Sequence, residues 1–144
     1  MKQQKEHNLS VMISQYMQLK HKNIIFRFDI ADLKLTMQQA VRLKAIQGDN
    51  AGYPDMFIAF ANKSFHGLYL ELKHSKDEYL KKDGSLRESV HIQKQAKMHD
   101  KLIRAGYYAT FAGGYKEAVE IIESYFDDLI VLKVKENINQ GVLF

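Results

Sequence analysis

Two acids and a lysine stand inside neighbouring hydrophobic runs near the middle of the chain. Asp55 follows Pro54, the only proline among the 144 residues, and Glu71 and Lys73 interrupt the run LYLELK. Two carboxylates that converge repel each other unless a proton or a cation lies between them, and such oxygen ligands suit Mg²⁺ or Mn²⁺. A neighbouring lysine can position a water molecule or stabilise developing negative charge. This combination predicts hydrolysis of phosphodiester bonds.

The residues before the first run indicate how the two acids could meet. The ring of Pro54 fixes its own backbone and holds the preceding residue extended, while Gly52 allows a tight approach of the chain. Asp55 should therefore emerge at the mouth of the strand that follows it. If this strand pairs with LYLELK as a hairpin, Asp55 and Glu71 converge on one point.

Alternation along LYLELK divides the run into two faces. Successive strand residues point to opposite sides, so Leu68, Leu70 and Leu72 share a core face while Glu71 and Lys73 share the other. An E-x-K pair at this spacing is also common as a surface ion pair worth about 0–1 kcal/mol. A Pro-Asp dipeptide is likewise an ordinary turn. An α/β protein with a purely structural ion pair is therefore an alternative interpretation.

Periodic apolar residues and turn signals predict the elements that position these side chains. Helices are expected where apolar residues recur at helical spacing, and strands where short runs are rich in β-branched and aromatic residues. The charged segment 75–89 is expected to be an exposed loop. The expected helices cover residues 3–20, 35–48, 92–105 and 115–126, and the expected strands cover 23–30, 56–60, 68–73, 107–112 and 129–134. This order predicts an α/β fold, with a mixed β-sheet flanked by helices.

The spacing of the charged residues resembles a known nuclease core. Pro54-Asp55, then fifteen residues, then Glu71-x-Lys73 is similar to the PD-(D/E)xK pattern. The stretches AGYPDMFIAF, LYLELK and QKQAKMHDKLIRAGYY resemble the VRR-NUC family within that superfamily. Gln95, eleven residues before the glycine that follows the helix, occupies the position of the family's glutamine. The resemblance covers approximately residues 4–126 and implies a restriction-endonuclease-like core of the αβββαβα type.

The resemblance also implies roles for the matched residues. Asp55, Glu71 and the backbone carbonyl of Leu72 would bind the metal ion. Lys73 would orient the attacking water or help to deprotonate it, and Gln95 would support the lysine or a phosphate. Glu6 resembles the family's N-terminal acidic residue, which would reach the metal directly or through water.

Positive charge is concentrated in the second half of the chain. Residues 73–104 hold nine Lys/Arg and five Asp/Glu, a difference of +4 that equals the net charge of the whole chain. Clustered positive charge attracts phosphate, although a solvated charged face is the simpler explanation. We expect the loop 75–89 to contact DNA through Lys76, Lys81, Lys82 and Arg87. We expect His91 and His99 to face DNA or solvent, and Tyr107, Tyr108 and Phe111 to belong to the core.

Length and composition exclude several other classes. A chain of 144 residues is expected to form one domain, residues 1–144. The absence of cysteine excludes disulfides and Cys-ligated zinc, and it fits an intracellular protein. There is no apolar run of about 20 residues and the N-terminus is polar, so we expect neither a membrane span nor a secretory signal. The expected location is the cytoplasm, or the host cytoplasm for a viral protein. The HExxH and GxxxxGK[ST] motifs are absent.

These inferences combine into one functional hypothesis. The chain is expected to be an Mg²⁺- or Mn²⁺-dependent DNA endonuclease, similar to small phage-type VRR-NUC proteins that act on branched DNA such as four-way (Holliday) junctions. One chain carries one site, so cutting two strands symmetrically predicts a homodimer. Residues 127–144 lie outside the resemblance, and LIVLKV and GVLF within them could form an edge strand or a dimer element. The alternatives are a non-catalytic DNA-binding module and a nuclease for flaps or plain duplex.

Overall fold

The computed structural model describes residues 2–29, 34–48 and 51–129, and it confirms the expected α/β architecture. The helices are α1 (Lys2–Lys20), α2 (Met37–Gln47), α3 (Val90–Arg104) and α4 (Tyr115–Phe126), with a short 3₁₀ turn, η2 (Lys76–Glu78). The strands are β1 (Ile25–Phe28), β2 (Met56–Ala59), β3 (Leu68–Lys73) and β4 (Tyr108–Gly113). The strand expected at residues 129–134 lies almost wholly outside the described residues, as does most of the proposed dimer element.

The four strands form one mixed sheet in the order β1-β2-β3-β4. β1 pairs with β2 and β2 with β3 in antiparallel fashion, whereas β3 and β4 are parallel. The parallel pair is joined by α3, because parallel neighbours need a long crossover connection. The predicted hairpin of β2 and β3 is confirmed, with Met56 opposite Leu70 and Ile58 opposite Leu68.

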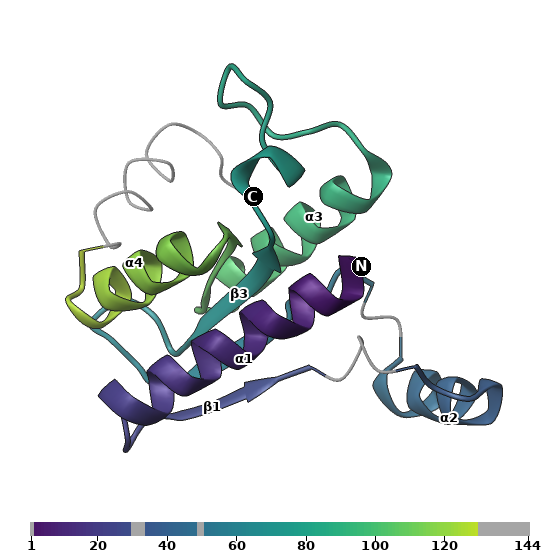
Figure 1. Cartoon of the computed structure of the whole chain (residues 1–144), viewed down its shortest axis with the longest axis horizontal. Helices are drawn as coiled ribbons and strands as arrows, with labels where there is room; N and C mark the ends of the chain where they lie inside the picture. Colours follow the sequence, from purple (N-terminus) through teal and green to yellow (C-terminus); the bar gives the residue numbers. More distant parts are fainter. Residues whose placement is uncertain (1, 30–33, 49–50, 130–144) are drawn as a thin grey trace.

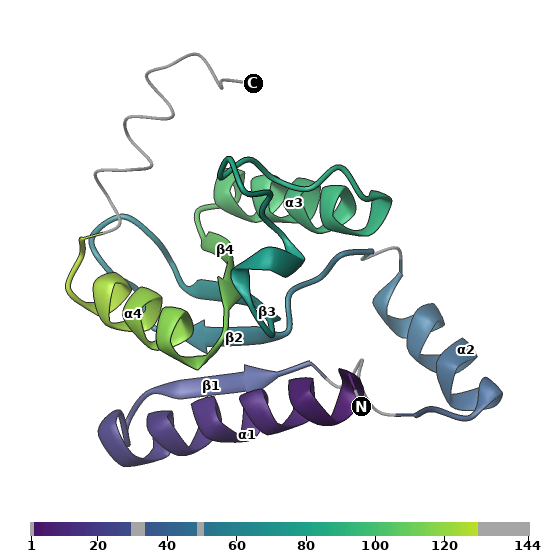
Figure 2. The ribbon, with the colours of Figure 1, turned by 45° about the horizontal axis from the view of Figure 1, so that its top comes forward.

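The helices cover the two faces of the sheet in different ways. α1 and α4 lie against one face and α3 against the other (Figures 1 and 2). The first face holds the main core, in which the leucines of β3 are buried as predicted. Its helix contributions are Leu9, Ile13 and Met17 from α1 and Ala118, Ile122 and Tyr125 from α4. The opposite face carries Glu71 and Lys73, and both are buried there.

The segment between β3 and α3 is a folded lobe rather than a simple exposed loop. After η2, Leu80 and Leu86 form an isolated antiparallel bridge around a tight turn. Tyr79 is buried, and its ring stacks on Phe111 of β4 at a centroid distance of 4.9 Å. Phe111 is therefore a core residue as expected. The prediction that this charged segment is exposed is correct for the turn at Lys82–Ser85. It is wrong for Tyr79, whose packing on Phe111 holds the segment against the sheet.

α2 stands apart from the rest of the molecule (Figure 2). Thr36 caps its first turn in a reciprocal pair with Gln39, and the helix ends at Gly48, which has a positive φ of 66°. None of its residues is buried, so this helix contributes little to the core. Within the described residues, the helices are too short or too polar to cross a lipid bilayer.

Substitution of a core residue on α1 tests how strongly this helix depends on the sheet. Ile13 is fully buried, whereas the adjacent Met12 points outward and is 46% exposed. We expect Ile13→Ala to lower the free energy of unfolding by about 2–5 kcal/mol, since it removes buried methyl groups and leaves a cavity. Urea denaturation followed by circular dichroism measures the change.

Met12→Ala is the matched control and should change the free energy of unfolding by no more than about 0.5 kcal/mol. Equal effects of the two substitutions would contradict the packing of α1 described above.

Candidate active site

The loop before β2 is fixed against α3, and this places Asp55. Gly52 has a φ of 82°, and a Cβ at this position would lie 2.8 Å from the carbonyl oxygen of Lys94 in α3. Only glycine permits both this conformation and this approach. Pro54 is fully buried, and it leads directly into Asp55. The tight approach predicted for Gly52 is therefore present, and it is made to the helix that carries Gln95.

The register of the hairpin brings Asp55 to Glu71. Met56 pairs with Leu70, so one further step places Asp55 opposite Glu71 on the same face of the sheet. The next step would pair Leu72 with Pro54, which has no N–H to donate to the Leu72 carbonyl. The Asp55 carboxylate takes the place of a backbone acceptor there, and its Oδ2 accepts a hydrogen bond from the Leu72 N–H at 2.8 Å. The Leu72 carbonyl points to the same side as its N–H, toward Asp55.

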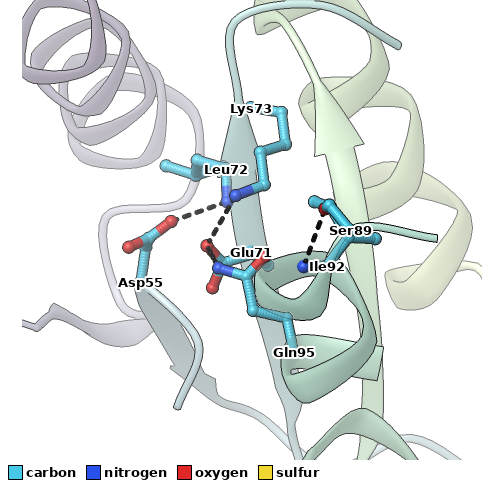
Figure 3. A network of polar contacts seen from close by, with 7 residues as sticks. All are labelled: Asp55, Glu71, Leu72, Lys73, Ser89, Ile92 and Gln95. Atoms are coloured by element: carbon cyan, nitrogen blue, oxygen red, sulfur yellow. Dashed lines mark hydrogen bonds and ion pairs between the residues drawn. The ribbon is translucent and has the colours of Figure 1, made fainter. Parts of the chain in front are cut away.

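Glu71 is the centre of a buried polar network (Figure 3). Glu71 is only 4% exposed, and Lys73 is 7% exposed. Lys73 Nζ donates to Glu71 Oε1 at 3.3 Å, and Gln95 Nε2 donates to the same oxygen at 2.6 Å. The second oxygen, Oε2, is buried, and no N–H or O–H group of the described residues donates to it. Such an unsatisfied buried oxygen indicates a site that can accept a proton or a cation.

Burial and the neighbouring acid raise the pKa of Glu71 to about 9. Desolvation is the larger cause, because the ionised carboxylate loses its water. The negative charge of the neighbouring Asp55 adds to it. Lys73 opposes the shift but does not cancel it. Glu71 therefore carries a proton at neutral pH in the absence of a cation.

His99 lies in the same buried region, which corrects the expectation that it faces DNA or solvent. It is one of the residues on the inner side of α3, one turn after Gln95, and it is only 5% exposed. Its ring packs edge-on against Phe111, and its Nε2 has no hydrogen-bond partner among the described residues. Burial, and secondarily Lys73, lower its pKa to about 4. The imidazole is therefore neutral at physiological pH. His91, in contrast, is exposed as expected.

A pocket of about 420 Å³ opens over this network. It brings together all of the residues predicted from the PD-(D/E)xK resemblance, namely Glu6, Asp55, Glu71, Leu72, Lys73 and Gln95. It is also lined by Ser10, Glu78 and Ser89, which the sequence reasoning missed. Of these, only Ser89 had a recognisable signal, since it is the N-cap of α3. Among the described residues no group of three acidic or histidine side chains is arranged to hold a metal ion. Glu6 therefore lines the pocket without completing such a cluster.

The basic residues predicted to contact DNA are placed on the folded lobe, but two of them are in ion pairs. Lys76 lies 3.1 Å from Glu117, and Lys81 lies 3.0 Å from Glu88. Arg87 donates through Nε to the carbonyl oxygen of Asp77, and Lys82 is exposed. These partners reduce the positive potential of the lobe.

A second basic surface was not singled out from the sequence. Four exposed basic residues recur at helical spacing on α3 and form one stripe: Lys94, Lys97, Lys101 and Arg104. We call them the α3 stripe. Their spacing of three, four and three residues can be read from the sequence. It was not recognised as one surface because the polar residues Gln95 and His99, which are buried, lie between them on the same helix.

Comparison with solved structures supports the fold. A chain described as "VRR_NUC domain protein" matches with a TM-score of 0.60 and 21% sequence identity, over 85% of this chain and 88% of that chain. No protein-family model matches the sequence, and no curated protein matches it. The chain therefore shares the overall fold of that VRR_NUC domain chain, as the sequence predicted.

The raised pKa of Glu71 predicts a pH dependence of stability in buffers without divalent ions. Glu71 ionises near its ordinary value of 4.5 when unfolded but only near 9 when folded. Its contribution to stability is therefore complete below pH 4.5 and is lost as pH rises toward 9. Glu71→Gln removes this titration, so the variant should gain stability relative to the wild type as pH rises.

Urea denaturation at a series of pH values measures this difference. Glu120→Gln, an exposed position on α4, is the control and should follow the wild type at every pH. Parallel curves for the wild type and Glu71→Gln would show that the Glu71 pKa is not raised in the folded protein.

Proposed function

We propose that this protein is a metal-dependent DNA endonuclease that hydrolyses phosphodiester bonds. The observation that carries the proposal is the buried Glu71 carboxylate, whose Oε2 has no hydrogen-bond donor among the residues that the structure describes, while Asp55 stands beside it. A structural ion pair needs only Lys73 and explains neither the second acid nor the unsatisfied oxygen. A cation between the two carboxylates would relieve both.

The donor set fits Mg²⁺ or Mn²⁺. Asp55, Glu71 and the Leu72 carbonyl would hold the ion, and all three are oxygen ligands. The register places Leu72 opposite Pro54, which has no N–H. The Leu72 carbonyl therefore receives no hydrogen bond from that position, and this supports its role as a metal ligand. Magnesium sites commonly use one or two carboxylates and keep several waters, so a third acidic side chain is not required. Glu6 would contribute from the pocket wall through water. Bound there, the ion would activate water and neutralise charge on the phosphate.

Lys73 and Gln95 would position the reacting groups. An ammonium group carries three donors, and Glu71 accepts only one of them in the network described above. The remaining donors of Lys73 can orient a water molecule or contact a phosphate oxygen. Gln95 donates to Glu71 and fixes the carboxylate in place, since both residues are buried between β3 and α3. The short loop at Gly52 holds Asp55 in register with them.

The charged surface supports DNA as the substrate. The α3 stripe lies on the helix whose first turns line the pocket, and Lys82 adds an exposed charge on the neighbouring lobe. Together they would bind the phosphate backbone, with an affinity that falls as salt concentration rises. We further propose that the substrate is branched DNA and that two copies act together, since one chain carries one pocket and a symmetric dimer would provide two.

Substitutions in the network test the reaction. Asp55→Ala and Glu71→Ala should each lower Mn²⁺- or Mg²⁺-dependent cleavage at least about 100-fold, because even outer-shell partners of a metal contribute about 10- to 100-fold. Lys73→Ala should lower turnover by about 10²–10⁴-fold, the range for a lost acid–base group. Cleavage of labelled four-way junction, flap and duplex DNA measures the rates, and anisotropy checks that DNA binding is retained.

Glu120→Ala on the outer side of α4 is the control and should cleave like the wild type. Wild-type rates in the Glu71→Ala variant would refute the assignment of the site.

Metal binding distinguishes an enzyme from a non-catalytic DNA-binding module with the same fold. Calorimetric titration with Mn²⁺ should show binding by the wild type, and Asp55→Asn and Glu71→Gln should weaken it. Because Glu71 carries a proton below its pKa of about 9, binding at pH 7 should release a proton and should tighten between about pH 6 and 8. Repeating the titration in buffers of different ionisation enthalpy measures the proton. DNA binding without any Mn²⁺ binding would favour the non-catalytic module.

A further inference from the structure

Aromatic side chains form a continuous strip beside the pocket, on the same face of the sheet as Asp55 and Glu71. The registers of β1, β2 and β3 align Arg27, Phe57 and Tyr69 in one row across the strands. This row lies two residues from Asp55 and Glu71 along the strands, which is about 7 Å. The strip is therefore adjacent to the point where a bound strand would be cut. We define the aromatic strip as Tyr53, Phe57, Tyr69, Tyr107 and His66.

The rings of the strip contact one another in sequence. Phe57 stacks on Tyr69 with centroids 4.5 Å apart, and Tyr53 meets the other edge of Tyr69 at 5.6 Å. Tyr107 lies 5.5 Å from Tyr69, and His66 continues the series 5.8 Å from Tyr107. Tyr53 is 40% exposed, and His66 is also exposed. Tyr53 and His66 therefore present ring surface to solvent, whereas Phe57, Tyr69 and Tyr107 are half-buried, so Tyr107 does not belong to the core as expected.

Two glycines make room for these rings. A Cβ at Gly67 would lie 2.7 Å from the Phe57 ring, and a Cβ at Gly106 would lie 2.5 Å from the ring of His66. Contacts this short cannot form, so any other residue at either position would displace the ring above it. The ring of Phe57 therefore lies directly over Gly67, and the ring of His66 lies directly over Gly106.

A second pocket of about 490 Å³ adjoins the strip and shares Tyr53 and Asp55 with the candidate active site. Its volume is within the range of small-ligand sites, about 300–1,000 Å³. Phe57 contributes a ring to its wall. Arg27, Asp29 and Gln47 contribute polar groups of both charges and an amide. A wall with both signs of charge suits the neutral, hydrogen-bonding edge of a nucleobase better than a phosphate.

We propose that the aromatic strip and this second pocket bind unpaired nucleotides of the DNA substrate, next to the bond that is cut. The inference rests on the proposed nuclease function and narrows its substrate to branched DNA with single-stranded bases at the branch. Aromatic rings stack on bases of any sequence because every base has a π-face, and a duplex offers no free base faces along its length. Arg27 beside Phe57 adds a planar cation of the kind that also stacks on bases.

Binding measured without divalent ions isolates this proposal from catalysis. The probes are a duplex of two annealed strands with a thymidine tail, the same duplex with a tail of abasic sites of equal length, and the blunt duplex. Tails are placed on the 5′ and on the 3′ end in turn. The abasic tail keeps every phosphate and removes the bases, so it separates stacking from charge. Fluorescence anisotropy in EDTA gives the affinities of the full chain.

We expect the thymidine tail on at least one end to bind at least about fivefold more tightly than the abasic tail, the lower limit for stacking of one base. Phe57→Leu and Tyr53→Leu should abolish this preference while leaving the affinity for the blunt duplex unchanged. Phe60→Leu is the matched control, because Phe60 is a partly exposed ring that packs on Phe126, away from the strip. It should retain the preference. Tyr53→Leu serves if Phe57→Leu does not fold, as judged by circular dichroism.

Two results would overturn the proposal. The first is equal affinity for thymidine and abasic tails of both polarities. The second is a change from dimer to monomer in light scattering on Phe57→Leu, which would show that a second copy of the chain covers the strip. Cleavage of the same probes by the wild type with Mn²⁺ is read separately. Cleavage combined with equal binding of thymidine and abasic tails refutes only the base-binding role of the aromatic strip. Tighter binding of the thymidine tail without any cleavage refutes only the proposed nuclease function.

Discussion

A carboxylate that is buried without full compensation is the constraint around which this molecule is built. One oxygen of Glu71 accepts hydrogen bonds from Lys73 and Gln95, and the other accepts none from the described part of the chain. Removing a carboxylate from water is unfavourable unless charge and hydrogen bonds replace the lost hydration. β3 supplies the lysine, α3 supplies the amide, and the loop before β2 supplies a second acid. The sheet order and the crossover helix are what bring these three segments to one point.

The fold and the central residues were predictable because they follow from short-range rules. Alternation along β3 fixed which side chains share a face, and the hairpin of β2 and β3 with Pro54 before it fixed the approach of Asp55. His99 and Tyr79 were not predictable in this way. Their burial depends on packing between α3, η2 and β4, where a histidine and a tyrosine meet Phe111. Neither polar residue type nor local charge reveals a contact of that kind.

The two faces of the sheet divide stability from chemistry. One face is filled by the leucines of β3 and by apolar side chains of α1 and α4. The other is only partly covered, since α3 lies over Glu71 and Lys73 while Tyr53 and Arg27 stay open to solvent. The alternation of side chains along the strands thus gives the same sheet a hydrophobic core on one face and the candidate active site on the other. Residues on the second face can change with less effect on the main core.

Helix α1 connects the candidate active-site pocket with α4, the last helix of the described residues. Glu6 lies near the start of α1, whereas the other end of this helix is held by α4, where His21 lies 2.8 Å and Lys20 3.1 Å from Glu123. During synthesis on the ribosome, α1 emerges more than 90 residues before α4 is complete, and until then the side chains of α1 that pack against α4 have no partner there. A nascent chain therefore carries Asp55 and Glu71 before it has a firm wall around them.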